Sequence, residues 1–371
     1  MNIGIDVRLL ERKITGIGRS LIMLLEELPK IDKKNKYFLF SYTPVKIDNN
    51  FYTNVSTTRS LVPQKLFSPI WNNFIFPFYL KKNNINILFS VNQILPLVKI
   101  KGCRYISMVH DVIYHADPVF LPYIYRKYLQ IFAHFSVRIS DAIVTVSEYS
   151  KKDILSNYEI DERKIKVILQ SASKNFTPMG LTESEKNKIK KRHGLNKHIV
   201  LYVGMIENRK NITGIIKVAD ALYEKDVDVQ FALVGKIGYG GAKILEEVKK
   251  RKNVLHLSNV DDKLLKELYN IADVFLFPSY YEGFGYPPLE AMQCGLPVIA
   301  ADNTSLREIV GTGGILHDAD DYHSMTQDIM KIIEDENYSR DIREKGIERA
   351  KNFDIEYTTE KLVNLFNSFE R

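Results

Sequence analysis

The chain has 371 residues, a length that exceeds one ordinary hydrophobic core and predicts two domains. Hydrophobic residues make up 45% of the sequence and charged residues 26%, which excludes a disordered or fibrous protein. The formal net charge is +7, and residues 1–100 alone carry +8, which favours an anionic partner unless the charge serves solubility alone. The sequence lacks zinc-finger spacing, a recognition-helix signature and an RNP motif. We therefore expect the anionic partner to be a membrane surface and not a nucleic acid.

The sequence predicts a cytoplasmic protein. Two cysteines, Cys103 and Cys294, are too few for a disulfide framework or a four-ligand zinc site. No uninterrupted apolar run is long enough to span a bilayer. Asp6 and Arg8 interrupt the segment in which a signal peptide would need apolar residues. We therefore expect a cytoplasmic location, peripheral at the inner face of the plasma membrane.

Six strands are predicted in the first half of the chain, where short β-branched runs alternate with longer helical patterns. They are residues 2–6, 37–42, 87–90, 105–110, 142–146 and 166–169. Such alternation is typical of βαβ units with a parallel sheet. Gly16 and Gly18, in the sequence TGIGR, lie where the first strand gives way to a helix, and His110 ends the fourth strand.

Aromatic residues are concentrated in the sequence FSPIWNNFIFPFY, residues 67–79, which is flanked by Lys65, Lys81 and Lys82. Aromatic and basic side chains together are typical of a segment at a membrane interface, where a lipid-linked acceptor would be located. A core helix with its loop is the alternative interpretation.

A second set of six strands follows a polar, lysine-rich stretch at residues 171–197, where Pro178 and Gly180 break regular structure. The set comprises residues 198–203, 229–234, 254–257, 274–278, 297–301 and 314–316. The last segment, residues 353–369, has apolar residues at helical spacing and no strand after it. The divisions we expect are a first domain at 1–172, a second at 173–352, and a terminal helix at 353–371 that packs back on the first.

The second half contains the stretch SYYEGFGYPPLEAMQCGLPVIA. A strand ends before it, and a loop leads to Pro287 and Pro288, which suit a helix start because the first turn needs no N–H from them. The positive end of the helix dipole then faces the loop, where Gly283 and Gly285, on either side of Phe284, allow close approach of a phosphate. This pattern predicts an anion site at the helix start.

Two glutamates eight positions apart flank the predicted anion site. Glu282 lies in the loop, and Glu290 lies about one turn into the helix, where a carboxylate can accept both hydroxyls of a ribose. A ligand with phosphates in the middle and sugars at both ends fits this arrangement, and a nucleotide sugar has that shape. The alternative interpretation is a helix cap with two surface glutamates.

A basic loop belongs to the same domain. The sequence LYVGMIENRKN places a strand, a glycine turn and then Arg209 and Lys210 in succession. Two cations at this point can neutralise a diphosphate leaving group, although a basic pair in a loop is otherwise simply solvated. Gly235 ends the next predicted strand, and Val260 follows the strand after that.

Together these motifs resemble the family 4 retaining glycosyltransferases of GT-B fold, in particular bacterial surface-polysaccharide mannosyltransferases. The resemblance implies an α/β fold with two facing Rossmann-like, doubly wound domains and a cleft between them. It also implies that Arg209 and Lys210 bind the donor phosphates and that Gly235 and Val260 lie beside the nucleobase. Many members carry an arginine directly after the turn glycine, where this chain has Met205, so we expect Arg209 to supply that charge.

The resemblance assigns roles in the first half as well. It places Gly16 and Gly18 in a turn that faces the cleft, and His110 near the transferred sugar, although a histidine at a strand end can be purely structural. The expected catalytic residues are therefore Glu282, His110 and Lys210. The Asn-Gly turn that usually precedes the hinge is replaced by Gln170 and Ser171.

We expect no metal site and no cofactor. Asp318, Ala319 and Asp320 form a D-x-D triplet, but they lie in a polar loop that follows a predicted strand. In the sequence pattern this loop is too far from the predicted helix start to hold a metal ion there. We interpret them as a surface turn. Ser305 and Glu308 have the spacing of a capping box, so we interpret the segment DNTSLREIVG as a structural helix.

The predicted activity is transfer of a hexose from a nucleotide sugar to a glycan or lipid-linked acceptor in O-antigen or capsule synthesis, with retention and without a divalent metal. GDP-mannose is the favoured donor, followed by UDP-hexoses and dTDP-rhamnose. The alternatives are another GT-B enzyme that uses a UDP- or dTDP-sugar, a nucleotide-sugar epimerase, or a non-catalytic nucleotide-sugar-binding protein at a membrane surface. An oxidoreductase is disfavoured because TGIGR lacks the full G-x-G-x-x-G pattern.

Overall fold

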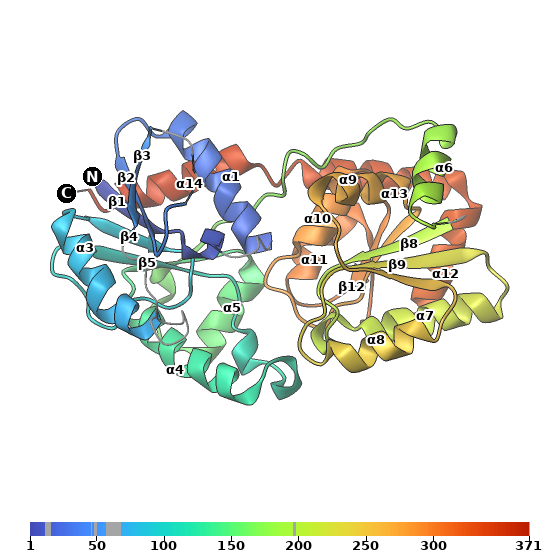
Figure 1. The fold of residues 1–371 in the computed structure, drawn as a ribbon, viewed down its shortest axis with the longest axis horizontal. Coiled ribbons are helices and arrows are strands. Elements are labelled where there is room, and N and C mark those ends of the chain that lie inside the picture. The colour runs from blue at the N-terminus through green and yellow to red at the C-terminus, as the bar shows by residue number, and fades with distance from the viewer. Residues whose placement is uncertain (12–15, 46, 48–49, 57–67, 196–197, 371) are drawn as a thin grey trace. The chain divides into compact units, whose positions relative to one another are not determined.

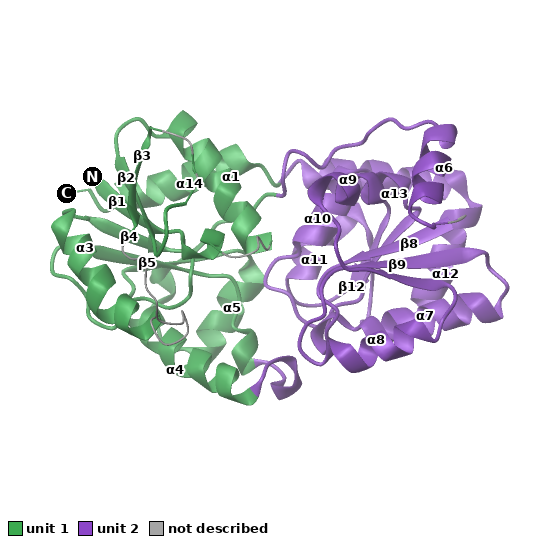
Figure 2. Ribbon diagram, viewed as in Figure 1, with its two compact units in different colours: residues 1–115, 123–171, 353–371 green, residues 116–122, 172–352 purple. Residues whose placement is uncertain are grey.

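The chain folds into two compact units, as seen in a computed structural model that describes residues 1–11, 16–45, 47, 50–56, 68–195 and 198–370 (Figure 1). Unit 1 comprises residues 1–115, 123–171 and 353–371, and unit 2 comprises residues 116–122 and 172–352 (Figure 2). The structure thus divides the chain at 171/172 and 352/353, beside the divisions expected from the sequence, and assigns the short segment 116–122 to unit 2.

Unit 1 is built on a seven-stranded parallel sheet with the order β3-β2-β1-β4-β5-β6-β7. Its strands are β1 (Asn2–Asp6), β2 (Lys36–Ser41), β3 (Tyr52–Ser56), β4 (Ile87–Ser90), β5 (Arg104–Val109), β6 (Ala142–Thr145) and β7 (Ile165–Val167). Its helices are α1 (Gly16–Ile31), α3 (Phe76–Lys82), α4 (Tyr123–Ile139), α5 (Glu148–Asn157) and α14 (Ile355–Asn367). Short turns of 3-10 or π-helix are η1 (Arg8–Glu11), η2 (Trp71–Ile75), η3 (Ile113–His115) and η5 (Glu162–Lys164).

Unit 2 has a six-stranded parallel sheet with the order β10-β9-β8-β11-β12-β13. Its strands are β8 (His198–Val203), β9 (Val229–Val234), β10 (Val254–Leu257), β11 (Val274–Phe277), β12 (Val298–Ala301) and β13 (Ile315–His317). Its helices are α6 (Glu183–Arg192), α7 (Ile212–Glu224), α8 (Gly241–Lys249), α9 (Asp262–Ile271), α10 (Tyr286–Gln293), α11 (Thr304–Val310), α12 (Tyr322–Glu334) and α13 (Glu336–Ala350). Its 3-10 turns are η4 (Pro118–Phe120), η6 (Asn208–Lys210) and η7 (Gly311–Gly313).

All twelve predicted strands are present, with ends displaced by at most two residues, because most of them are short runs of buried apolar side chains. The sequence did not reveal β3, whose Tyr52 is its only buried residue. Both sheets are doubly wound, which confirms the predicted pair of Rossmann-like folds. The strand order reverses between β1 and β4 in unit 1 and between β8 and β11 in unit 2. Ligands of such sheets bind at the carboxyl ends of the strands that flank this reversal.

The aromatic segment around Trp71 has an inner and an outer face. Trp71 and Phe76 are buried and stack with ring centroids 4.4 Å apart, in a cluster beneath η2 and α3. Phe74 and Phe78 are exposed on the other face. The inner face is the core helix of the second interpretation, and the membrane interface stays a prediction for the outer face. Phe67 and Lys65 lie outside the described residues.

The terminal helix α14 belongs to unit 1. The ring of Phe366 packs against Phe89 and Tyr37, with centroids 5.5 and 6.5 Å away, and Thr358 donates a hydrogen bond to the carbonyl oxygen of Leu169. Among the described residues, no helix is both long and apolar enough to cross a bilayer.

Candidate active site

Helix α10 begins directly after a buried loop that follows β11. Its N-cap is Gly285, and Tyr286, Pro287 and Pro288 are the first three helical residues, so the predicted helix start is confirmed. Gly285 has φ of +123°, and a side chain there would also approach Leu306 to 3.0 Å. Since neither proline carries an N–H, Tyr286 supplies the only amide of these three residues. The positive end of the helix dipole is directed to this point.

The loop is anchored by helix α11. The hydroxyl of Ser305 lies 2.9 Å from the carbonyl oxygen of Glu282 and 2.7 Å from that of Phe284, and Thr304 Oγ1 accepts from the Glu282 amide at 3.3 Å. The predicted capping box of Ser305 and Glu308 is therefore wrong. Asn303 is the N-cap, and the buried Ser305 hydroxyl meets loop carbonyls that would otherwise lack a donor.

The carboxyl ends of β8 and β9 meet at two glycines. A side chain on Gly235 would place its Cβ 1.8 Å from the carbonyl oxygen of Gly204, so only glycine permits this approach. The Gly235 amide donates to Leu257 at 3.0 Å, and its carbonyl oxygen lies 2.7 Å from Nε2 of His256. Gly235 therefore sits at the same edge of the sheet as the basic loop. Val260 is half-buried in the loop between β10 and α9, one residue before the N-cap of α9.

Four charged side chains form a cluster where β8 and β11 end, in which Arg209 is half-buried and the other three are buried. Glu282 forms an ion pair with Lys210 and a second with Arg209 at 3.1 Å, and it accepts a hydrogen bond from Ser279 at 2.7 Å. Arg209 also pairs with Glu207 at 2.8 Å and donates to the carbonyl oxygen of Tyr281 at 2.7 Å. The structure thus brings together three of the predicted residues, Arg209, Lys210 and Glu282, at the strand reversal of unit 2.

Glu207 is a member of this cluster that the sequence prediction missed. It is buried and holds the guanidinium of Arg209 on the side away from Glu282. The only sequence signal was a carboxylate two positions before Arg209 in ENRKN. With Glu207 included, the cluster holds two cations and two carboxylates, and its formal charge is zero.

Burial and charge act against each other in the cluster. Burial disfavours the charged form of Glu282, but Lys210 and Arg209 together hold the pKa of its carboxyl below the usual range. Burial, together with the charge of Arg209, lowers the pKa of Lys210 below that of an ordinary lysine, although Glu282 opposes this. An entering diphosphate would compete with Glu282 for both cations.

Glu290 lies on the buried side of α10. Its side chain is largely inaccessible, and the hydroxyl of Tyr269, on α9, donates to its carboxylate at 2.8 Å. Glu282 and Glu290 therefore belong to the same loop and helix but have different partners: the first is held by cations and the second by a phenol.

Three predicted site residues belong to unit 1. Gly16, exposed, and Gly18, buried, lie in the first turn of α1, while Thr15 of the same motif is outside the described residues. His110 follows β5 and is buried, and burial lowers its pKa to about 4, so its ring is neutral at pH 7. Within the described chain its Nε2 has no hydrogen-bond partner, and its carbonyl oxygen accepts from Ser150 Oγ at 3.0 Å. These residues are not part of the cluster described in unit 2.

The D-x-D triplet forms a turn after β13, in which the Asp320 amide donates to Asp318 Oδ1 at 2.9 Å. Asp318 and Asp320 are exposed, as expected for a surface turn, and Tyr280, in the loop before α10, donates to Asp320 at 2.7 Å. Tyr322 donates to the same oxygen. In the described part of the chain, no group of three or more His, Cys, Asp or Glu side chains is placed to hold a metal ion.

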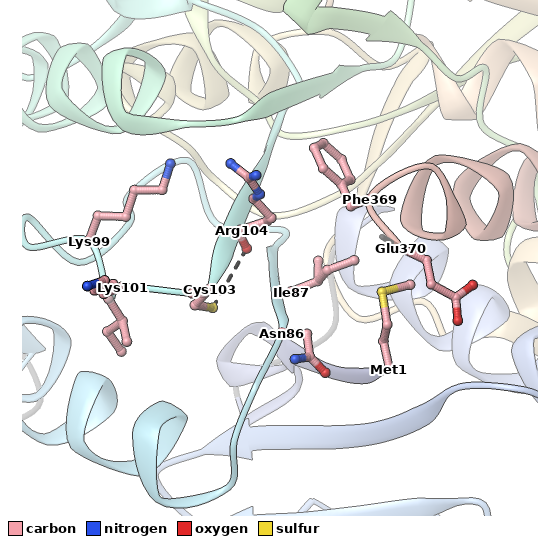
Figure 3. Close-up of a pocket in the computed structure, with 11 residues that line it drawn as sticks. Met1, Asn86, Ile87, Lys99, Lys101, Cys103, Arg104, Phe369 and Glu370 are labelled. Atoms are coloured by element: carbon pink, nitrogen blue, oxygen red, sulfur yellow. Dashed lines mark hydrogen bonds between the residues drawn. The ribbon is translucent and has the colours of Figure 1, made fainter.

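A cavity of about 590 Å³ lies at the other edge of the unit 1 sheet, where β1, β4 and β5 begin (Figure 3). Residues lining it include Met1, Asn86, Lys101 and Cys103, and burial raises the pKa of the Cys103 thiol to about 12. None of the predicted site residues lines this cavity. The amino ends of parallel strands are not where doubly wound sheets bind their ligands, so the cavity is separate from the candidate active site.

Two doubly wound units, one with a neutral cluster of charges beside a helix start, define a glycosyltransferase of GT-B fold. The family described as Glycosyltransferase Family 4 matches residues 14–170, and the family described as Glycosyl transferases group 1 matches residues 183–349. Together these two matches span most of the chain, and the chain belongs to the family 4 glycosyltransferases.

Two relatives and one solved structure illustrate the similarity. O-antigen chain mannosyltransferase B of Escherichia coli is 28% identical over 270 residues, which are 71% of this chain and 70% of that protein. O-antigen chain mannosyltransferase RfbU of Salmonella typhimurium is 27% identical over 293 residues, which are 76% of this chain and 74% of that protein. The structure of HepE from Anabaena in complex with UDP-glucose has a TM-score of 0.73 and 18% identity, and covers 99% of this chain and 100% of that one.

Proposed function

We propose that this glycosyltransferase moves a hexose, in the first instance mannose from GDP-mannose, to a glycan or lipid-linked acceptor in the synthesis of a surface polysaccharide. The observation that carries the proposal is the cluster of Arg209, Lys210 and Glu282 at the strand reversal of unit 2, beside the start of α10. The relatives' names, which refer to O-antigen mannosyltransferases, support the choice of mannose and of a polysaccharide acceptor.

The donor diphosphate would bind to Arg209, Lys210 and the loop amides around Gly283, Phe284 and Gly285. As the bond between the sugar C1 and the phosphate oxygen breaks, negative charge grows on the diphosphate, and the two cations stabilise it. The acceptor oxygen forms its bond to C1 on the face that the diphosphate leaves, and its proton passes to a phosphate oxygen. The anomeric configuration is then retained.

The remaining predicted residues would position the donor. Once a diphosphate takes over Lys210, Glu282 is available to accept hydrogen bonds from hydroxyls of the hexose. Glu290 would accept those of the ribose, and Gly235 and Val260 would lie beside the base. From unit 1, Gly16, Gly18 and His110 would face the sugar, with the neutral His110 ring able to accept or donate one hydrogen bond.

We propose that transfer needs no divalent metal, because Arg209 and Lys210 supply the positive charge that a cation supplies elsewhere. We also propose an anionic membrane surface as a partner, since a lipid-linked acceptor resides in a bilayer.

The test is transfer to a lipid extract from a panel of nucleotide sugars, with excess EDTA in one arm and magnesium in the other. We expect activity with at least one donor, GDP-mannose first, and equal rates in both arms. Loss of activity in EDTA, restored by magnesium and abolished by Asp318→Asn with Asp320→Asn, would move the phosphate-binding role to the D-x-D turn. Donor binding without turnover of any member of the panel would instead support a non-catalytic binding protein.

A further inference from the structure

Three segments of unit 1 lie side by side and are joined by hydrogen bonds. In the loop that follows β4, the Leu97 amide donates to Asn73 of η2 at 2.9 Å, and the Leu95 carbonyl oxygen accepts from Asn72 at 3.1 Å. On its other side the Leu95 amide donates to Ser136 of α4 at 2.9 Å. The loop is therefore held between η2–α3 and α4.

The inner sides of these segments share one hydrophobic cluster. Phe76 and Leu80 of α3 and Leu95 of the loop belong to it, and the partly buried Ile139 of α4 packs against it (α3 and α4 are labelled in Figure 1). Because the three segments are neighbours, apolar residues that are exposed on them lie in one region of the surface of unit 1.

The outer side carries apolar residues that the fold leaves uncovered. Phe74 is 72% exposed and Phe78 62%, and their spacing of four places them on one side of the helical segment. Val98, in the loop, is 67% exposed, and Ile131 and Phe135, again four apart, are about half exposed on α4. We call the set the outer apolar surface: Phe74, Phe78, Leu97, Val98, Ile131 and Phe135.

Basic residues outnumber acidic ones in the sequence around the outer apolar surface. Residues 49–110 contain seven lysines and arginines and no aspartate or glutamate, and α4 also has no acidic residue. Lys99 and Arg104 pair with Asp141, which follows α4. Within the described chain, no ion pair engages the exposed Lys81, Lys82, Lys127 or Arg138.

We propose that the outer apolar surface lies on an anionic lipid bilayer. Aromatic and aliphatic side chains at the headgroup boundary, surrounded by basic residues, are the combination that binds such interfaces. A second copy of the chain fits less well, because a symmetric contact would bring two basic surrounds together. The proposal rests on the proposed function, since a lipid-linked acceptor brings the reaction to a bilayer.

The test is co-sedimentation with vesicles of phosphatidylcholine alone and of an equal mixture of phosphatidylcholine and phosphatidylglycerol. We expect the wild type to pellet with the mixed vesicles only and to be released by salt. A variant with Phe74→Ser, Phe78→Ser and Phe135→Ser should lose at least about tenfold in affinity, and so should Lys81→Glu with Lys82→Glu. The matched controls are Tyr223→Ser, exposed on α7, and Lys243→Glu with Lys249→Glu on α8, which should bind like the wild type.

Turnover of the donor with a water-soluble acceptor separates this proposal from the proposed function, because the surface variants should retain it in full. Three outcomes would overturn the proposal that this surface binds a bilayer. They are equal pelleting of wild type and variants, equal binding of the wild type to both kinds of vesicle, and no binding at all. A loss of mass in light scattering for the serine variant would show instead that the surface joins two copies. If the wild type bound vesicles but showed no turnover, that result would contradict the proposed function and leave the bilayer proposal standing.

Discussion

The two units have the same kind of sheet but use the strand reversal differently. In unit 1 a buried ion pair, Asp6 with Arg8, lies at the end of β1, and the guanidinium is 4.3 Å from the ring centroid of Trp71. Asn92 donates a hydrogen bond to Asp6, and Arg8 donates one to the hydroxyl of Tyr42. In unit 2 the corresponding point holds two cations and two carboxylates beside a helix start. One arrangement is enclosed by aromatic rings, whereas in the other, under the proposed function, a diphosphate would replace a carboxylate.

The units also differ in charge. Unit 1 carries a formal charge of +9 and unit 2 of −2, which together give the +7 of the chain. The proposed donor is polyanionic, yet its proposed site belongs to the unit with negative net charge, so local residues would have to attract it. The difference teaches that the shared sheet fixes where loops end, while the side chains in those loops decide between stability, chemistry and surface attachment.

The largest effect is expected from Arg8→Ala. It leaves the Asp6 carboxylate buried without its cation, which should lower the free energy of unfolding by about 3–5 kcal/mol. Urea unfolding followed by circular dichroism checks this, with the exposed Arg163→Ala as a control that should change nothing. Normal stability with lost transfer would mean that Arg8 binds a substrate and that the two units are alike at this point.

Lys210→Ala should act on chemistry. We expect kcat to fall by about a hundredfold or more, because Lys210 stabilises charge that grows as the glycosidic bond breaks. Stability should fall less than in the Arg8 variant, since Arg209 still pairs with Glu282. Steady-state kinetics and urea unfolding on both variants give the comparison, and Lys225→Ala is the exposed control. A stability loss as large as that of Arg8→Ala, with transfer per folded molecule unchanged, would make the cluster structural.

Glu290→Gln should mainly raise the donor KM, by about 1–3 kcal/mol in binding free energy, with kcat nearly unchanged. The expected ribose contact is made equally in the ground and transition states. Tyr269→Phe is the matched control, because it removes only the hydroxyl that orients Glu290 and should have a smaller effect. A fall in kcat with unchanged KM would contradict the assignment to the ribose.

His110 gives the smallest expected effect, seen as a pH dependence of stability. Burial holds its pKa at about 4 in the folded chain, whereas an unfolded histidine has a pKa near 6.5, so the unfolded state takes up the proton first as pH falls. This contribution is fully present above pH 6.5 and is lost toward pH 4, by about 1 kcal/mol between pH 7 and 5.5.

The free energy of unfolding is measured for the wild type and His110→Asn at several pH values in this range. The difference between their slopes against pH gives the contribution of His110. Equal slopes would show that His110 is accessible to protons in the folded state.

Much of the fold was predictable because buried strands read as runs of apolar residues and the start of α10 reads as paired prolines. β3 was missed because an edge strand with one buried side chain leaves no such run. In the site, the sequence indicated Arg209, Lys210 and Glu282 but not Ser305, whose helical spacing to Glu308 suggested a cap.

What the sequence could not indicate were contacts between loops that follow different strands. The contact of Tyr280 with Asp320 is of this kind. The role of Glu207 beside Arg209 depends on another, that of Arg209 with Glu282, and no regular spacing along the sequence reveals either contact.

The position of α14 sets an order for folding during synthesis. Unit 2 ends at residue 352, so its whole sequence has been made while the chain still lacks Phe366. The ring of Phe366 fills a place between Tyr37 and Phe89, residues that are synthesised well before unit 2. Most of unit 1 must therefore keep part of its core open until all of unit 2 has been translated, and it is the unit that a chaperone would have longer to protect.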